Sequence, residues 1–326
     1  MTTSDNINSD TAVTLTSNGI ALDTSPEKFG ELRDSMDIVD DVAAQRARMA
    51  DEGYLFFRGL MSREEVLAAR HEILLKYATA GEIDSINHPL MDAIYSENSF
   101  IDKINLRAFT ESIRTGLAYE NVALNKKVIG FYEKFFDDAV HPYDFRWPRF
   151  VRPSEGCGFH YDGPYMNRGT DRVYTSWIPL GDVAKTEGAL IVLENSHKSD
   201  ELLSSYAKKD ADKEKIGWLS TNPIKLQERF GGRWLSTDFQ AGDMLCFTMH
   251  TLHGALDNNS PIKRCRLTSD TRYQPASEPI DERWNGAKPE AHGYDKVFLP
   301  GLGAWNNQEF QDEWKLVDDY GRLVLK

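Results

Sequence analysis

A histidine and an aspartate stand two residues apart, at His160 and Asp162, in a stretch punctuated by glycines. In an extended segment alternate side chains point to the same side, so we expect these two side chains to share a face. One imidazole and one carboxylate are two of the three ligands in the two-His-one-carboxylate triad, which holds Fe(II) and leaves metal positions open for reaction. A His-x-Asp pair alone is a common surface pattern. The prediction therefore depends on a second histidine further along the chain.

Two later histidines compete for the third position. The Gly-Asp pair at 242–243 predicts a tight turn before an apolar strand over 244–249, and His250 and His253 follow it. We expect His253 to be the ligand, because it directly precedes a glycine at the end of the strand, where a side chain can face a metal. We expect His250 to be a packed or supporting residue.

Two arginines follow the histidines, at Arg264 and Arg266, and their spacing places both on one face of a predicted strand. Oxygenases of this iron class bind 2-oxoglutarate, whose keto acid chelates the metal while its distal carboxylate needs a partner. A guanidinium meets a carboxylate through two parallel hydrogen bonds. Either arginine is suited to this role, and the other is then a surface charge.

Composition limits the class of protein. The chain has 326 residues, of which 40% are hydrophobic and 27% charged, with a net charge of −13, as in soluble globular proteins of one large domain or two smaller ones. The acidity and the lack of a Lys/Arg-rich run argue against nucleic acid as a partner. We find neither a membrane-length apolar run nor a signal peptide. Three cysteines, odd in number and far apart, favour a reducing cytoplasm over a disulfide framework.

The first half of the chain reads as helical. Residues 1–22 are polar and predict a disordered tail, and residues 23–326 are expected to form one domain with a helical N-terminal half. The expected elements are a helix over 38–50 ended by Gly53, a strand over 54–60, a helix over 62–77 opened by a Ser62/Glu65 capping box, and mainly helices over 84–146, clearest at 121–136.

The second half reads as β-structure. From residue 146 onward, short apolar runs are separated by Gly, Pro, Asn and Asp, as in sandwiches and barrels. The runs lie at 150–152, 172–178, 189–193, 244–249 and 266–273. We therefore predict a mainly β protein with supporting helices, built as the double-stranded β-helix (jelly roll) of cupins.

These motifs resemble the phytanoyl-CoA dioxygenase family of Fe(II)/2-oxoglutarate-dependent oxygenases. The resemblance rests on the His160-x-Asp162 pair, the run Gly-Asp-Met-Leu-Cys-Phe from residue 242, His253-Gly254 and a downstream arginine. Two further blocks agree, one over 51–66 and one from Trp177 to His197. Together they cover about residues 37–275 in the family's order. One departure is Glu194-Asn195, where the family usually has Pro-Gly before Ser-His.

The resemblance implies a set of site residues. His160, Asp162 and His253 match the iron ligands. The arginine for 2-oxoglutarate precedes an aromatic at the strand's end by seven residues in the family, which gives Arg266; the usual spacing of eleven from the distal histidine gives Arg264 instead. A loop two residues longer than usual reconciles the two counts, and we choose Arg266. Trp177 stands where the family lines the cofactor pocket, although a core aromatic would also fit.

The activity implied is a dioxygenase that uses Fe(II), 2-oxoglutarate and O₂. We expect it to hydroxylate an unactivated carbon of a small organic molecule and to decarboxylate 2-oxoglutarate to succinate. The alternatives are desaturation or cyclisation by the same kind of site, or an inactive cupin-like binding protein. Asp162 argues against halogenation, since halogenases of the family lack this carboxylate. The substrate, the oligomeric state and the role of residues 276–326 are not predicted.

Overall fold

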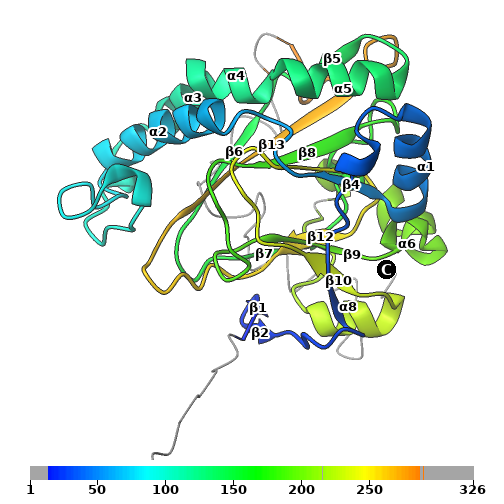
Figure 1. Cartoon of the computed structure of the whole chain (residues 1–326), viewed down its shortest axis with the longest axis horizontal. Coiled ribbons are helices and arrows are strands. Elements are labelled where there is room, and N and C mark those ends of the chain that lie inside the picture. The colour runs from blue at the N-terminus through cyan, green and yellow to red at the C-terminus, as the bar shows by residue number, and fades with distance from the viewer. Residues whose placement is uncertain (1–13, 215, 287–288, 290–326) are drawn as a thin grey trace, which may run out of the picture.

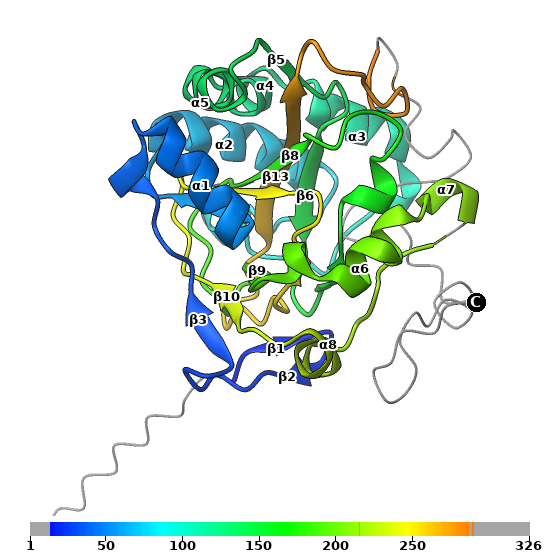
Figure 2. The same ribbon diagram turned by 90° about the vertical axis from the view of Figure 1, so that its right-hand side faces the viewer.

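Two β-sheets face one another, and a layer of helices covers the outer face of one of them (Figures 1 and 2). The computed structural model describes residues 14–214, 216–286 and 289. The larger sheet has the order β4-β11-β8-β13-β5, and β6 also pairs with β13. Its strands are β4 (Tyr54–Phe57), β5 (Val140–Pro142), β6 (Trp147–Val151), β8 (Tyr174–Pro179), β11 (Met244–Thr248) and β13 (Arg266–Pro275).

The smaller sheet has the order β3-β10-β9-β12-β7. Its strands are β3 (Phe29–Glu31), β7 (Cys157–His160), β9 (Leu190–Leu193), β10 (Trp234–Ser236) and β12 (His253–Ala255). Only β3 and β10 run parallel among the paired strands that the structure describes. Two facing, almost wholly antiparallel sheets with helices behind one of them form the predicted jelly roll.

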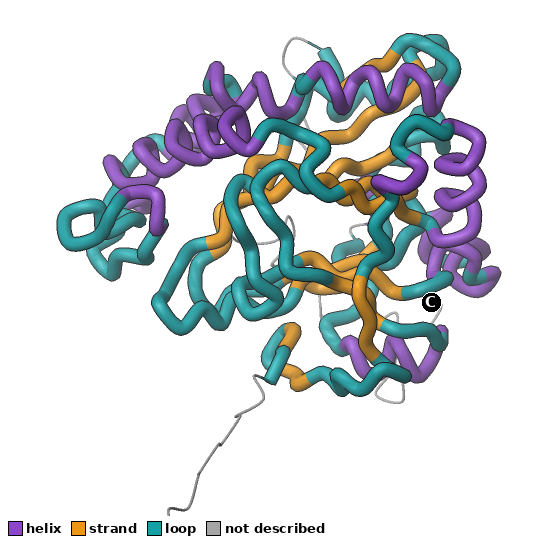
Figure 3. The backbone as a smooth tube through the Cα atoms, viewed as in Figure 1, coloured by secondary structure: helices purple, strands orange, loops and turns teal. Residues whose placement is uncertain are grey.

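The longest helices lie in the first half of the chain, and helices, strands and loops are distinguished by colour in Figure 3. The α-helices are α1 (Val42–Glu52), α2 (Arg63–Thr79), α3 (Leu106–Arg114), α4 (Leu117–Ala123), α5 (Lys126–Phe136), α6 (Asp200–Ser204), α7 (Ala211–Glu214) and α8 (Pro223–Phe230). Helices α2 to α5 lie along the outer face of the six-stranded sheet (Figure 1). Short 3-10 turns, η1 to η6, lie at Met36–Ile38, Leu90–Asp92, Ile101–Lys103, Gly163–Tyr165, Ser196–Lys198 and Tyr206–Lys208.

Local signals set several helix ends. The Ser62 hydroxyl accepts a hydrogen bond from the Glu65 backbone N–H, so α2 begins where the capping box predicts. Gly53 ends α1 in the left-handed region, at φ 78°. The single helix expected over 121–136 is instead two helices, because the Asn125 side chain caps a new start by accepting from the Lys127 backbone N–H.

Strand β13 crosses the middle of the larger sheet with all ten residues buried. Its odd-numbered residues face the helices: the Tyr273 hydroxyl donates to the Ala123 carbonyl at 2.7 Å, and Ser269 pairs with Tyr119 at 2.9 Å. Its even-numbered residues face the other sheet and are all polar or charged, namely Arg266, Thr268, Asp270, Arg272 and Gln274. A row of polar side chains therefore runs through the space between the sheets.

The prediction of a disordered tail over residues 1–22 is wrong for residues 14–22. Residues 16–21 form a hairpin of β1 (Thr16–Ser17) and β2 (Ile20–Ala21), and Leu15 and Leu22 are buried beside it. The Asp257 carboxylate anchors the hairpin by accepting from the Thr16 hydroxyl and two backbone N–H groups. This long-range contact is not visible in local composition. Residues 1–13 lie outside the described residues. Among the described helices, none is long and apolar enough to cross a membrane.

Candidate active site

The structure brings His160, Asp162 and His253 together between the sheets. Strands β7 and β12 are neighbours, and their pairing sets His253 directly opposite His160. Oδ1 of Asp162 lies 3.8 Å from Nε2 of His160 and 3.9 Å from Nε2 of His253. One nitrogen or oxygen from each of the three lies within 4.8 Å of the others, and all three residues are buried. Two imidazole nitrogens and one carboxylate oxygen at this spacing suit a divalent transition metal.

Asp162 reaches this position by a turn. Strand β7 ends at His160, and Asp162 has near-helical angles of φ −70° and ψ −26° at the start of η4. The two-residue spacing suggested that His160 and Asp162 share a face of one strand. The structure shows a different cause, because Asp162 lies beyond the strand. The turn that leads into η4 brings the carboxylate back toward the histidine.

Both histidines present Nε2 to the space between them. Nδ1 of His160 lies 3.0 Å from the Gly158 carbonyl, and Nδ1 of His253 lies 2.9 Å from the Thr251 carbonyl. A carbonyl only accepts, so each Nδ1 carries the proton and each Nε2 keeps a lone pair. Burial, with the neighbouring His253, lowers the pKa of His160 to about 3, and burial also lowers the pKa of His253. Both rings are therefore neutral near pH 7, as metal binding requires.

Asp162 is ionised despite its burial. Burial raises the pKa of this carboxyl, but the Arg272 guanidinium, helped by the hydrogen bond from Thr175, opposes burial, and the pKa lies well below its ordinary value. Nη2 of Arg272 donates to Oδ1 at 3.1 Å and to Oδ2 at 3.0 Å, and the Thr175 hydroxyl donates to Oδ2. Arg272 is 2% exposed, with its guanidinium 4.2 Å from the centre of the Trp147 ring. These partners hold the carboxylate in one orientation.

The two candidate arginines occupy different surroundings. Arg266 is the first residue of β13 and faces between the sheets, where it donates to the Gly188 carbonyl; its guanidinium lies 6.0 Å from the Trp177 ring centre. Arg264 precedes the strand, donates to the Asp92 carbonyl at 3.3 Å and lies 3.5 Å from a Glu187 carboxylate oxygen. The predicted common face is therefore not observed.

Several buried polar atoms on the inner face of β13 have no hydrogen-bond partner among the described residues. They are Arg266 Nε, Thr268 Oγ1, Asp270 Oδ1, Arg272 Nε and Nη1, and Gln274 Oε1. Buried polar groups are normally hydrogen-bonded, so a row of exceptions indicates where a polar ligand binds. Sequence reasoning missed Thr268, Asp270 and Arg272, although polar residues at every second position of an otherwise buried strand are the signal that would have found them.

Comparison with known proteins assigns the chain to a family. The model of the phytanoyl-CoA dioxygenase family matches residues 49–265. The chain belongs to this family of Fe(II)/2-oxoglutarate-dependent oxygenases. The matched residues include His160, Asp162, His253 and Trp177, and the match ends one residue before Arg266.

Curated relatives and solved structures agree with this assignment. A 1-deoxypentalenic acid 11-beta-hydroxylase of Streptomyces arenae is 24% identical over 265 residues, covering 77% of this chain and 87% of the relative. The enzyme of the same name from Streptomyces exfoliatus is 22% identical over 258 residues, covering 75% and 85%. The non-heme alpha ketoglutarate dependent carbocyclase SnoK shares the fold, with a TM-score of 0.53 at 15% identity over 81% of this chain and 94% of SnoK.

A small cavity adjoins the candidate metal ligands of this family member. Its volume is about 40 Å³, so aromatic side chains rather than open space fill most of the region beside the three residues. The lining residues are Trp147, Arg149, Cys157, His160, Asp162, Tyr165, Met166, Trp218, Arg272 and Trp284. The ring centres of Trp147 and Trp284 are 4.8 Å apart. A substrate larger than a few atoms requires at least one of these rings to move.

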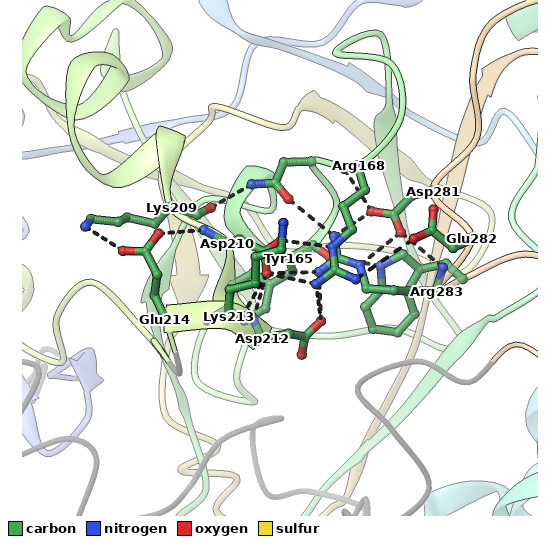
Figure 4. Close-up of polar contacts among 12 residues, drawn as sticks. Tyr165, Arg168, Lys209, Asp210, Asp212, Lys213, Glu214, Asp281, Glu282 and Arg283 are labelled. Atoms are coloured by element: carbon green, nitrogen blue, oxygen red, sulfur yellow. Dashed lines mark hydrogen bonds and ion pairs between the residues drawn. The ribbon is translucent and has the colours of Figure 1, made fainter.

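An ionic cluster joins chain segments next to the cavity residues Tyr165 and Trp284, and Figure 4 shows its polar contacts. Arg283 donates to Asp281 at 2.9 Å and to Asp212 at 2.8 Å, and Arg168 donates to Asp210 at 2.9 Å. These pairs join the segment after η4, the start of α7 and the chain beyond β13. The neighbouring Trp284 donates from its indole to the Tyr165 carbonyl at 2.9 Å. The segment after residue 275, whose role the sequence left open, therefore supplies part of the pocket wall through Trp284.

His250 lies apart from the other candidate ligands. It lines a separate surface pocket of about 380 Å³ with residues that include Arg46, Arg172 and His197. Its ring centre is 5.8 Å from that of Tyr161. The structure thus places His253, rather than His250, beside His160 and Asp162.

We expect Arg272→Met to destabilise the metal-free oxygenase by about 3–5 kcal/mol, because it leaves the Asp162 carboxylate buried without its cation. Added metal should recover part of this loss, since the ion supplies positive charge to the same carboxylate. Urea unfolding with and without Co(II) measures both effects. The control is Arg63→Met, whose partner Asp182 is half exposed; an exposed pair contributes about 0–1 kcal/mol. Equal losses in the two variants would contradict this role for Arg272.

Proposed function

We propose that the protein hydroxylates an unactivated carbon of a small, largely apolar organic molecule, using O₂ and converting 2-oxoglutarate to succinate. The observation that carries the proposal is the buried pair of neutral histidines and ionised aspartate, at metal-binding distances, next to the polar face of β13, on which several buried atoms lack described partners. The curated relatives are named as hydroxylases of an organic acid, which favours hydroxylation over desaturation or cyclisation. The three cysteines, all unpaired, support a cytoplasmic location.

The three clustered residues are suited to hold the iron. Nε2 of His160, Nε2 of His253 and an oxygen of Asp162 are the donor atoms that we assign to the metal. When bound there, iron would activate O₂ with two electrons supplied by the oxidation of 2-oxoglutarate to succinate and CO₂, and would so provide the oxidant for the substrate C–H bond. The Gly158 and Thr251 carbonyls hold the two imidazoles in the metal-binding tautomer, and Arg272 and Thr175 fix the carboxylate.

Arg266 is our choice for the distal carboxylate of 2-oxoglutarate. It is buried, its Nε has no partner among the described residues, and it lies on the same face of β13 as Arg272, which contacts Asp162. Thr268, two residues further along the same face of β13, has a hydroxyl that also lacks a described partner. Trp177, next to the guanidinium, provides the side wall.

The test of this function is anaerobic reconstitution with Fe(II). We expect a weak visible absorption band that needs both iron and 2-oxoglutarate and that disappears in His253→Ala. Admitting O₂ with 1-deoxypentalenic acid as the first candidate substrate should yield succinate, with one oxygen atom added to the organic product. A protein that binds iron but forms neither the band nor succinate would be a binding protein of the same fold.

A further inference from the structure

Arg149 is the cationic residue of the cavity that has no place in the proposed handling of iron and 2-oxoglutarate. It lies in the middle of β6, directly opposite Thr268 of β13, so its side chain faces between the sheets. It lines the cavity together with His160 and Asp162. Its side chain is 29% exposed, which is enough to reach a bound molecule and too little to be an ordinary surface charge.

The guanidinium of Arg149 is only partly used by the protein. Its Nε donates to Oδ2 of Asp270 at 2.6 Å. Its two terminal nitrogens make no hydrogen bond or ion pair with any residue that the structure describes. The Asp270 contact holds one edge of the planar group in place and leaves the fork of four N–H donors for another partner. A fork held in this way matches the two oxygens of a carboxylate.

The rest of the cavity wall indicates what carries that carboxylate. Away from the metal ligands the lining side chains are large and mostly apolar, and they include Trp147, Trp218, Trp284 and Met166. The other guanidinium at the cavity, Arg272, pairs with Asp162 through Nη2, and its Nε and Nη1, which have no partner among the described residues, are fully buried. One partly exposed cation with free donors on an otherwise mostly aromatic wall suits a molecule with an apolar body and a single anionic group.

We propose that Arg149 forms a carboxylate-binding subsite and that the primary substrate is an apolar carbon skeleton bearing a carboxylate. This inference rests on the proposed function and deepens it by naming the substrate class. The carboxylate of 2-oxoglutarate nearest the metal offers the same chemistry, so the experiment separates these two sources.

The test measures binding to the anaerobic enzyme loaded with Fe(II) and 2-oxoglutarate. The probes are cyclohexanecarboxylate and cyclohexanecarboxamide, which share a skeleton and differ in charge; the readouts are the shift of the visible band and the fluorescence of the cavity tryptophans. We expect the carboxylate to bind about 10- to 100-fold more tightly than the amide. Arg149→Gln should abolish this preference while changing 2-oxoglutarate affinity less than about threefold.

Two further variants keep the result interpretable. Arg149→Lys retains the charge without the fork and should keep only part of the preference. Arg146→Gln is the matched control, because Arg146 pairs with Glu120 at 3.1 Å and does not line the cavity; its carboxylate preference should equal that of the unaltered protein. Melting temperatures of all variants show whether each is folded.

Three outcomes would overturn the inference. If Arg149→Gln weakens 2-oxoglutarate binding and leaves the probe preference intact, Arg149 serves the co-substrate. If the unaltered protein binds both probes equally or binds neither, the cavity has no carboxylate subsite. If Arg149→Gln retains the preference, the subsite lies elsewhere. In each case an intact iron–oxoglutarate band shows that iron and 2-oxoglutarate still bind as the proposed function requires, whereas absence of that band in the unaltered protein shows that the proposed function itself has failed.

Discussion

Replacing Arg266 with alanine is expected to weaken the apparent affinity for 2-oxoglutarate by roughly 30- to 4000-fold. Removing one partner of a buried, hydrogen-bonded charge pair costs roughly 2–5 kcal/mol, and each ~1.4 kcal/mol is a factor of ten. Arg266 is 6% exposed, so little water is available to replace the guanidinium. The distal carboxylate lies far from the reacting carbon, and iron affinity should therefore change little. Anaerobic titration of the visible band with 2-oxoglutarate measures the loss.

Two companion variants sharpen this prediction. Arg264→Ala should have a mild effect, because Arg264 lies outside the strand and contacts Glu187 and the Asp92 carbonyl. Arg266→Lys should recover only part of the affinity, since an ammonium cannot form two parallel hydrogen bonds. A large defect in Arg264→Ala with normal binding in Arg266→Ala would show that the eleven-residue spacing was the correct count.

Replacing His160, Asp162 or His253 with alanine is expected to abolish iron-dependent turnover. Each change removes one of three donor groups that lie within 4.8 Å of one another, and no other His, Cys, Asp or Glu in the described part of the chain joins them. Iron content after reconstitution should fall with each change. Succinate formation should fall to the level seen without enzyme.

The control for the ligand set is His250→Ala. His250 lies in the separate surface pocket, so this variant should bind iron and retain most activity. Circular dichroism and urea unfolding should show all four variants folded. Activity in His253→Ala together with its loss in His250→Ala would exchange the roles of the two histidines.

Much of the fold could be predicted from the sequence, because its helices and strands depend on local residue patterns. Glycine and proline punctuation between short apolar runs predicts a jelly roll, and the structure has its two facing sheets. The capping box at Ser62 and the glycine at 53 fix helix ends that need only neighbouring residues. The predicted ligands at 160, 162 and 253 meet because β12 pairs with β7 and sets His253 opposite His160.

The remainder depends on contacts between distant segments. The ion pair between Arg272 and Asp162 joins residues 110 positions apart, and no local sequence pattern predicts it. Trp284 lines the cavity next to Arg283, which is held by Asp281 and by Asp212 from α7. The hairpin at 16–21 likewise depends on Asp257, more than 200 residues away. Asp162 lies beside the two histidines, as predicted, but a turn places it there and not the strand that the sequence suggested.

The unpaired atoms on the inner face of β13 also bear on how firmly the chain folds. Each buried donor or acceptor left without a partner costs the ligand-free protein free energy that an apolar side chain of similar shape would not. Selection for thermal stability alone would therefore favour apolar residues at positions such as Arg266 and Thr268. A ligand that binds only the folded state adds about 2.7 kcal/mol at a concentration of 100 times its Kd. The cellular supply of iron and 2-oxoglutarate thus governs how long the protein survives proteolysis as well as how fast it turns over.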